Sequence, residues 1–217
     1  MERSEIAIVI PIFNEEKTIE PLLINLKKIG SLIAVDDCSN DSTPLILKKF
    51  NLKIIKNSKN IGYEKSLKKG LVYAVKKKFK YVVTVDGDGE HYISDVKKVV
   101  RQLKFSDLVY TNRKNVFRIS EKILKFFFSR TIQIEDPLSG LKGYNINLLK
   151  KYDFKNWNGT FGSDILIFAK LKNYTISKIN IKINKRRDSS RIGDNIFINL
   201  SILKLLFVLF QKNNFKY

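Results

Sequence analysis

Short apolar runs alternate with helical patterns along the first half of the chain. The run at residues 6–12 is continuously apolar, which is typical of a parallel strand buried on both faces. Further runs predict strands at residues 32–35, 52–55, 81–85 and 107–111. Repeated strand–helix–strand units of this size predict an α/β fold with a mostly parallel sheet flanked by helices.

Helical spacing appears between these strands. A first helix is predicted at about residues 17–28 and another at 62–78, where apolar residues form one stripe opposite lysines. Ser94 is the predicted N-cap of a later helix, because valines and a leucine recur at helical spacing after it.

Acidic and amide residues follow each of the first four predicted strands. They stand at residues 13–16, 36–43, 57–62 and 86–91. In open α/β sheets, ligands bind beyond the carboxyl ends of the strands. We therefore expect these polar segments to share one ligand site along that edge.

Two carboxylates, Asp86 and Asp88, follow the fourth predicted strand with Gly87 between them. Both can face a hard divalent cation, and Gly87 leaves room for a phosphate. Mg²⁺ and Mn²⁺ favour carboxylate oxygens and share their shell with substrate phosphates, and Glu90 or His91 could supply another ligand. The alternative is an ordinary acidic turn, but the position after a buried strand favours a metal site.

Two other polar pairs at strand ends could either cap a helix or bind a ligand, and the sequence does not decide between these roles. The Asp36–Asp37 pair could accept hydrogen bonds from a nucleobase, while Ser39 or Asp41 caps the next helix. The Asn14–Glu15 pair could likewise cap the first helix or contact a ligand.

Four motifs stand in a fixed order in the first half of the chain, at residues 11–15, 36–43, 60–62 with Gly70, and 85–88. Together their order and spacing resemble those of family 2 glycosyltransferases, over at least the first 115 residues. The resemblance implies a GT-A fold, a nucleotide-diphosphate sugar donor and inversion at the anomeric carbon.

The second half is similar to a narrower group, the dolichol-phosphate mannose synthases and their bacterial polyprenyl-phosphate relatives. The similar segments are residues 136–142, 173–176 with 179–183, 186–191 and 203–210. The basic loop at 186–191 is one residue shorter than in that group and lacks its glycine. Leu141 replaces an aromatic residue, and Glu90 stands where Gln is commoner.

The resemblance also implies roles for single residues. Base and ribose contacts are implied for Pro11, Phe13, Glu15, Val35 and Asp37, and metal ligation for Asp86, Asp88 and Glu90. Arg113 would approach the sugar or the phosphates, and Arg186 and Arg191 would close over the diphosphate and the acceptor phosphate. These arginines could instead belong to a generally basic surface.

The acceptor decides whether a catalytic base is needed. A sugar hydroxyl must lose a proton, usually to a carboxylate, and Asp136 and Asp164 are the strong candidates in the second half. A phosphomonoester has its second pKa near about 6 and is already largely a dianion at neutral pH. With a polyprenyl phosphate, Asp136 would therefore only position groups. A family 2 enzyme that uses a saccharide hydroxyl in cell-surface glycan synthesis is the alternative.

The formal net charge is +20, from 41 Lys and Arg against 21 Asp and Glu. It is compatible with nucleotide diphosphates, an anionic membrane surface or nucleic acid as partners, or with a compositional bias toward Lys, Asn, Ile and Phe. A nucleic-acid-binding module needs basic and aromatic residues interleaved on one face, and the acidic clusters at the strand ends argue against this class. A descendant of the family that binds without catalysis is the other alternative, and the presence of Asp86 and Asp88 argues against such a loss of activity.

The length fits a single domain at residues 1–217, with a nucleotide-sugar half at 1–115 and an acceptor half at 116–217. Residues 196–210 predict an amphipathic helix that suits a membrane interface or packing on the sheet. That run is shorter than the roughly 20 apolar residues of a membrane span, and we expect no signal peptide. The single cysteine, Cys38, fits a reducing compartment. We expect a cytoplasmic protein bound peripherally to a membrane.

Overall fold

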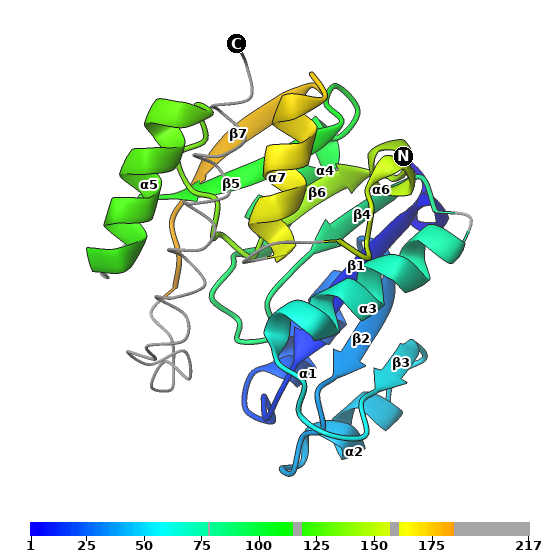
Figure 1. Ribbon diagram of the computed structural model, residues 1–217. Coiled ribbons are helices and arrows are strands. Elements are labelled where there is room, and N and C mark those ends of the chain that lie inside the picture. Colours follow the sequence, from blue (N-terminus) through cyan, green and yellow to red (C-terminus); the bar gives the residue numbers. More distant parts are fainter. Residues whose placement is uncertain (78, 115–118, 157–160, 185–217) are drawn as a thin grey trace.

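The computed structural model describes residues 1–77, 79–114, 119–156 and 161–184, and within them the strands form one seven-stranded sheet of order β3-β2-β1-β4-β6-β5-β7 (Figure 1). The strands are β1 Ile6–Ile12, β2 Ser31–Asp36, β3 Lys53–Lys56, β4 Tyr81–Thr84, β5 Leu108–Arg113, β6 Lys142–Asn145 and β7 Ile176–Ile181. Only β6 runs antiparallel to its neighbours in this sheet. The predicted α/β fold with a mostly parallel sheet is confirmed.

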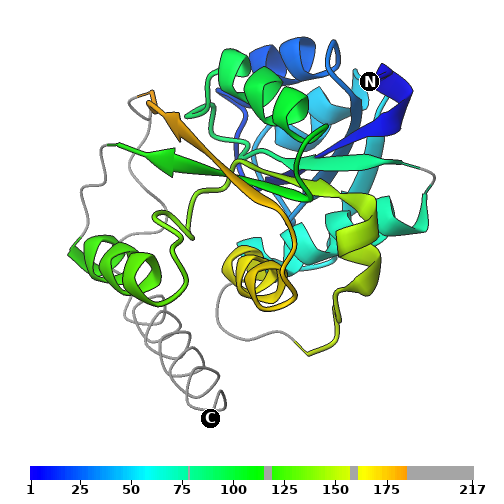
Figure 2. The same cartoon turned by 90° about the horizontal axis from the view of Figure 1, so that it is seen from above.

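The described helices lie on both faces of the sheet (Figure 2). They are the 3-10 helix η1 Arg3–Glu5, α1 Ile19–Leu26, α2 Thr43–Lys48, α3 Tyr63–Lys76, α4 Ile93–Gln102, α5 Ile119–Thr131, α6 Ile146–Lys151 and α7 Phe161–Leu171. Buried side chains of α1, α2 and α4 form one core cluster. Those of α3, α5, α6 and α7 belong to a second cluster on the opposite face.

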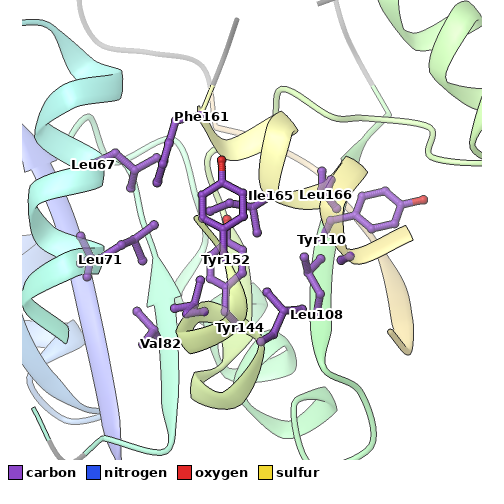
Figure 3. Packing of buried hydrophobic residues seen from close by; sticks show 14 of the residues in the cluster. Leu67, Leu71, Val82, Leu108, Tyr110, Tyr144, Tyr152, Phe161, Ile165 and Leu166 are labelled. Atoms are coloured by element: carbon purple, nitrogen blue, oxygen red, sulfur yellow. The ribbon is translucent and has the colours of Figure 1, made fainter. Parts of the chain in front are cut away.

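Strand β1 contributes to both clusters, which explains its continuous apolar run. Ile8 and Ile10 belong to the cluster with α1, whereas Ala7 and Val9 belong to the cluster with α3. Successive strand residues point to opposite faces, so a polar residue at any of these positions would be buried without water. Figure 3 shows the second cluster, with Leu67 of α3 beside Phe161 of α7.

The predicted elements of the first half are present, with shifts at their ends. The prediction of Ser94 as an N-cap is wrong, because α4 begins at Ile93 with Tyr92 as its N-cap. The carbonyl of Tyr92 accepts the first helical bonds, and His91 is held extended by a bridge to Ile183. The backbone thus turns into the helix earlier than the side-chain pattern indicates.

Several predictions fall beyond the described residues. Arg186, Arg191 and the predicted helix at 196–210 all lie outside them. No helix within the described ranges has the length and apolar character that a bilayer span requires.

Candidate active site

The loops that follow β1 and β2 are bonded to each other. The backbone N–H of Asn14 donates to Ser39 Oγ at 2.9 Å, and Asn14 Oδ1 accepts from the N–H of Asn40 at 2.8 Å. The N–H of Glu15 donates to Thr43 Oγ1 at 2.8 Å. The polar residues expected along this edge therefore lie together. The N-cap of α1 is Thr18, so Asn14 joins the two loops rather than capping that helix.

Asp37 is buried, and its carboxylate is bonded within the protein. Its Oδ1 accepts from Asn57 Nδ2 at 2.8 Å and from the N–H of Ile61 at 2.9 Å, and its Oδ2 accepts from the N–H of Gly62 at 2.8 Å. Asp37 thereby fixes the approach to α3. Asp41 Oδ1 accepts from the N–H of Thr43 at 2.9 Å, so Asp41 rather than Ser39 bonds the start of α2.

The other residues expected near the nucleotide differ in exposure. Pro11 and Val35 face each other as backbone partners in β1 and β2, and both are buried. The side chain of Val35 has no exposed surface, so the structure does not place it at an open site. Phe13 and Glu15, in the loop after β1, are partly exposed.

Asp86, just beyond β4, has both carboxylate oxygens bonded. Tyr63 Oη donates to Oδ1 at 2.7 Å, and His91 Nε2 lies 3.3 Å from Oδ2. Burial alone would raise the pKa of Asp86, but the bonds from His91 and Tyr63 hold that pKa below its usual range. The backbone of Gly140 lies close to the same carboxylate. A Cβ added at Gly140 would stand only 1.9 Å from Asp86 Oδ2, so a larger residue does not fit there.

Asp88 and Glu90 complete the acidic turn, which we define as residues 86–90. The N–H of Glu90 donates to Asp88 Oδ1 at 3.0 Å. A Cβ at Gly87 would lie 3.3 Å from the carbonyl oxygen of Pro11, so the glycine lets this turn lie against the end of β1. Among the residues that the structure describes, no three His, Cys, Asp or Glu side chains gather as a metal site. Any cation at this turn would need further ligands from a substrate.

A second charged cluster, Arg113–Asp136–Lys125, lies at the end of β5. Arg113 binds Asp136 through two nitrogens, with Nε–Oδ2 of 2.8 Å and Nη2–Oδ1 of 3.0 Å. Lys125 Nζ lies 3.2 Å from the same Oδ2. Burial would raise the pKa of Asp136, but Arg113 and Lys125 hold it below its usual range, so two cations share one buried carboxylate.

A groove of about 550 Å³ opens beside this cluster. Its lining residues are Asn112, Arg113, Lys114, Lys125, Phe126, Ser129 and Glu135. The ring of Phe126 is 58% exposed, and Arg130 stacks on it at 5.2 Å. The groove thus combines cationic groups with an exposed aromatic ring.

The segment 136–140 links the two charged regions, because Asp136 binds Arg113 while Gly140 lies against Asp86. Asp164, the other base candidate, is buried and accepts a bond from Tyr152 Oη at 2.5 Å. The structure thus joins Arg113 and Asp136, which the sequence marked separately.

Three functional candidates were missed by the sequence reading: Tyr63, Glu64 and Lys142. Glu64 Oε2 accepts from the N–H of Phe161 at 2.8 Å, and Lys142 Nζ donates to the carbonyl of Ser139. All three line a polar cavity of about 30 Å³ beside the acidic turn. Tyr63 and Glu64 directly follow the motif at residues 60–62, and Lys142 ends the similar segment at 136–142, but the sequence reading gave none of the three a role.

The model of glycosyl transferase family 2 matches residues 7–161. The chain belongs to this family. This glycosyltransferase is 32% identical over 221 residues to an uncharacterised protein of Methanocaldococcus jannaschii, covering 94% of this chain and 91% of that one. It is 26% identical to the UDP-N-acetylglucosamine–dolichyl-phosphate N-acetylglucosaminyltransferase of Methanococcus voltae, covering 94% and 95% of the two chains.

A dodecaprenyl-phosphate galacturonate synthase of Rhizobium johnstonii is also 26% identical, over 68% of this chain and 49% of that protein. The resemblance to polyprenyl-phosphate glycosyltransferases is therefore confirmed. Among solved structures, glucosyl-3-phosphoglycerate synthase of Mycobacterium tuberculosis, in complex with Mn²⁺, UDP and phosphoglyceric acid, superposes with a TM-score of 0.75 at 20% identity. The match covers 95% of this chain and 78% of that one, and it confirms the GT-A fold.

Proposed function

We propose that this glycosyltransferase moves a sugar, with inversion, from a nucleotide diphosphate to a polyprenyl phosphate. The observation that carries the proposal is the pairing of two oppositely charged regions across residues 136–140, the acidic turn at one end and the Arg113–Asp136–Lys125 cluster at the other. A cation and a phosphate are the ligands that these two regions attract. The two relatives named for lipid-phosphate transfer support the choice of acceptor.

The donor side of the proposal uses the loops after β1, β2 and β4. Asp88, with Asp86 and Glu90, would hold Mg²⁺ or Mn²⁺, since carboxylate oxygens suit these ions and diphosphate oxygens would complete the shell. The bound ion would offset the negative charge of the departing diphosphate. Phe13 and Glu15 would contact base and ribose, while Pro11, Val35 and Asp37 would shape the backbone beneath them. Whether the base is uracil or guanine is an outcome of the binding test below.

The acceptor side of the proposal uses the cationic groove. A phosphate dianion needs no base, and Asp136 is a poor one because Arg113 and Lys125 stabilise its ionised form. Asp136 would instead hold Arg113 where an attacking phosphate can be positioned. A saccharide hydroxyl would need a base, and Asp164 is buried against Tyr152. These features favour the lipid phosphate.

The proposal also assigns a role to each half of the chain and a location to the enzyme in the cell. Residues 1–115 would serve mainly the donor and residues 116–217 the acceptor, with Arg186 and Arg191 closing over the phosphates. Because a polyprenyl acceptor lies in a bilayer, the enzyme would work as a peripheral protein on the cytoplasmic face.

Two assays test the proposal. Binding of UDP- and GDP-sugars is measured by calorimetry with Mn²⁺ and with a chelator, and a metal-dependent signal is expected for one of the bases. Transfer is then measured to a short-chain polyprenyl phosphate and to a saccharide. Product on the lipid phosphate supports the proposal, whereas product on the saccharide alone would replace it with the hydroxyl acceptor.

Asp88→Ala is expected to abolish metal-dependent binding of the nucleotide sugar and to lower turnover by at least about a thousandfold, because a cation ligand is removed. The matched control is Asp153→Ala, which removes an exposed aspartate after α6. Circular dichroism should show both variants folded. Undiminished turnover of Asp88→Ala would remove the metal from the mechanism.

A further inference from the structure

Three consecutive residues at the start of α3 bond three separate parts of the site. The N–H of Gly62 donates to Asp37 at 2.8 Å, Tyr63 Oη donates to Asp86 at 2.7 Å, and Glu64 accepts from the N–H of Phe161 at 2.8 Å. This first turn of α3 is therefore fixed on both sides of Tyr63. The tyrosine hydroxyl is presented to the acidic turn from a rigid helix rather than from a loop.

The Asp86 carboxylate is confined on several sides. Tyr63 binds Oδ1, His91 lies against Oδ2, and the backbone of Gly140 leaves no room for a Cβ beside it. An ionised carboxylate only accepts hydrogen bonds, so the phenol must be the donor in its pair.

Resting on the proposed function, we propose that Tyr63 is a positioning residue: its hydroxyl orients the Asp86 carboxylate so that the acidic turn can receive a divalent cation with the donor diphosphate. The phenol acts through Asp86 and need not touch the substrate. Nothing in the family match itself assigns this task, since it depends on the bond from α3 to the turn after β4.

The test compares Tyr63→Phe with Tyr73→Phe, which removes one hydroxyl from the same helix away from the acidic turn. The dissociation constant of Mn²⁺ is measured by electron paramagnetic resonance in the presence of whichever of UDP and GDP the unaltered enzyme binds. A hydrogen bond to a charged group is lost only in the first variant, so its Mn²⁺ affinity should fall about tenfold or more. Tyr73→Phe should bind like the unaltered enzyme.

A double-mutant cycle with Asp86→Ala, which removes the acceptor of the Tyr63 hydroxyl, separates positioning from packing. If Tyr63 acts through Asp86, the change Tyr63→Phe should alter Mn²⁺ affinity less than about twofold in the Asp86→Ala background. An equal loss in both backgrounds, as from damaged packing, would overturn the inference, and so would an unchanged affinity in Tyr63→Phe. If the unaltered enzyme binds no Mn²⁺ with either nucleotide, the proposed function itself fails.

Discussion

At the end of β4, the carboxylate of Asp86 is bonded by a tyrosine and a histidine, whereas at the end of β5 the carboxylate of Asp136 is bonded by two cations. Both aspartates have a pKa below the usual range, so both are ionised. The residues around each aspartate therefore decide the net charge of the region in which it lies. Around Asp86, with Asp88 and Glu90 close by in sequence, the surplus is negative. Around Asp136 the surplus is positive.

The difference shows how one residue type can serve opposite ligands. A phenol can orient a carboxylate without cancelling its charge, so that region can still attract a cation. An arginine that binds a carboxylate through two nitrogens is itself held rigid, and a second cation leaves charge for a phosphate. The two regions are joined through residues 136–140, so changes in either one, or in the link, can test the comparison.

Asp136→Ala should have the largest effect on stability. It leaves Arg113 and Lys125 without their shared buried partner, and the free energy of unfolding should fall by about 3 to 5 kcal/mol. Urea unfolding measures the loss. Glu135→Ala is the matched control, because its pair with Lys178 is partly exposed and should contribute less than about 1 kcal/mol. Equal losses in both variants would mean that the β5 cluster is an ordinary surface ion pair.

The first half of the chain was the more predictable part of the fold. Strands β1, β2 and β4 are covered on both faces, so burial imposes apolar runs that are visible in the sequence. The polar segments after them could be placed together by topology alone, and the bonds of Asn14 to Ser39 and Asn40 confirm it. The N-cap of α4 was mistaken because a bridge from His91 to the distant Ile183, not the local pattern, fixes the entry to the helix.

Strand β6 gave almost no signal. Its four residues are Lys142–Asn145, which contain a buried lysine and a glycine rather than an apolar run. It is a strand because it lies between β4 and β5, where backbone pairing on both sides outweighs propensity. Because β6 carries Lys142 into the interior, the polar cavity beside Asp86 could not be predicted either.

The site residues also divide into those that the sequence could mark and those that it could not. Asp86, Asp88, Arg113 and Asp136 have side chains whose chemistry marks them in the sequence. The bond from Tyr63 to Asp86 has no such mark, because a tyrosine at the start of a helix is equally consistent with packing. Val35 is the reverse case, since resemblance implies a nucleotide contact for it while its apolar side chain is fully buried in the core.

Gly140→Ala should disturb the link between the two regions. The new Cβ would stand 1.9 Å from Asp86 Oδ2, and Tyr63 and His91 hinder the carboxylate from moving away. Such overpacking should cost about 1 to 3 kcal/mol of unfolding free energy. Thermal unfolding measures it, and the double variant Gly140→Ala with Asp86→Ala serves as the control. The added methyl should cost little once the carboxylate is gone; an equal cost in both backgrounds would place the strain elsewhere.

The smallest expected effect concerns Glu64, the carboxylate that joins α3 to α7 between the two regions. Burial raises the pKa of Glu64, whereas the N–H groups of Phe161 and Gly162 and the ammonium of Lys142 lower it. Burial is the larger effect, and the pKa of Glu64 is raised to about 7. The folded protein therefore holds a proton that the unfolded chain has released between pH 4.5 and about 7. Its contribution to stability is complete below pH 4.5 and is lost as the pH rises toward about 7.

Glu64→Gln should therefore remove a decline in unfolding free energy of roughly 1 kcal/mol per pH unit within that window, since the amide still accepts from Phe161 but does not titrate. Urea unfolding at a series of pH values measures the slope. Glu20→Gln, on the exposed side of α1, should leave it unchanged. If the slope survives in Glu64→Gln, then Glu64 is ionised at neutral pH, and the cavity beside Asp86 carries a further negative charge that would strengthen the contrast with the end of β5.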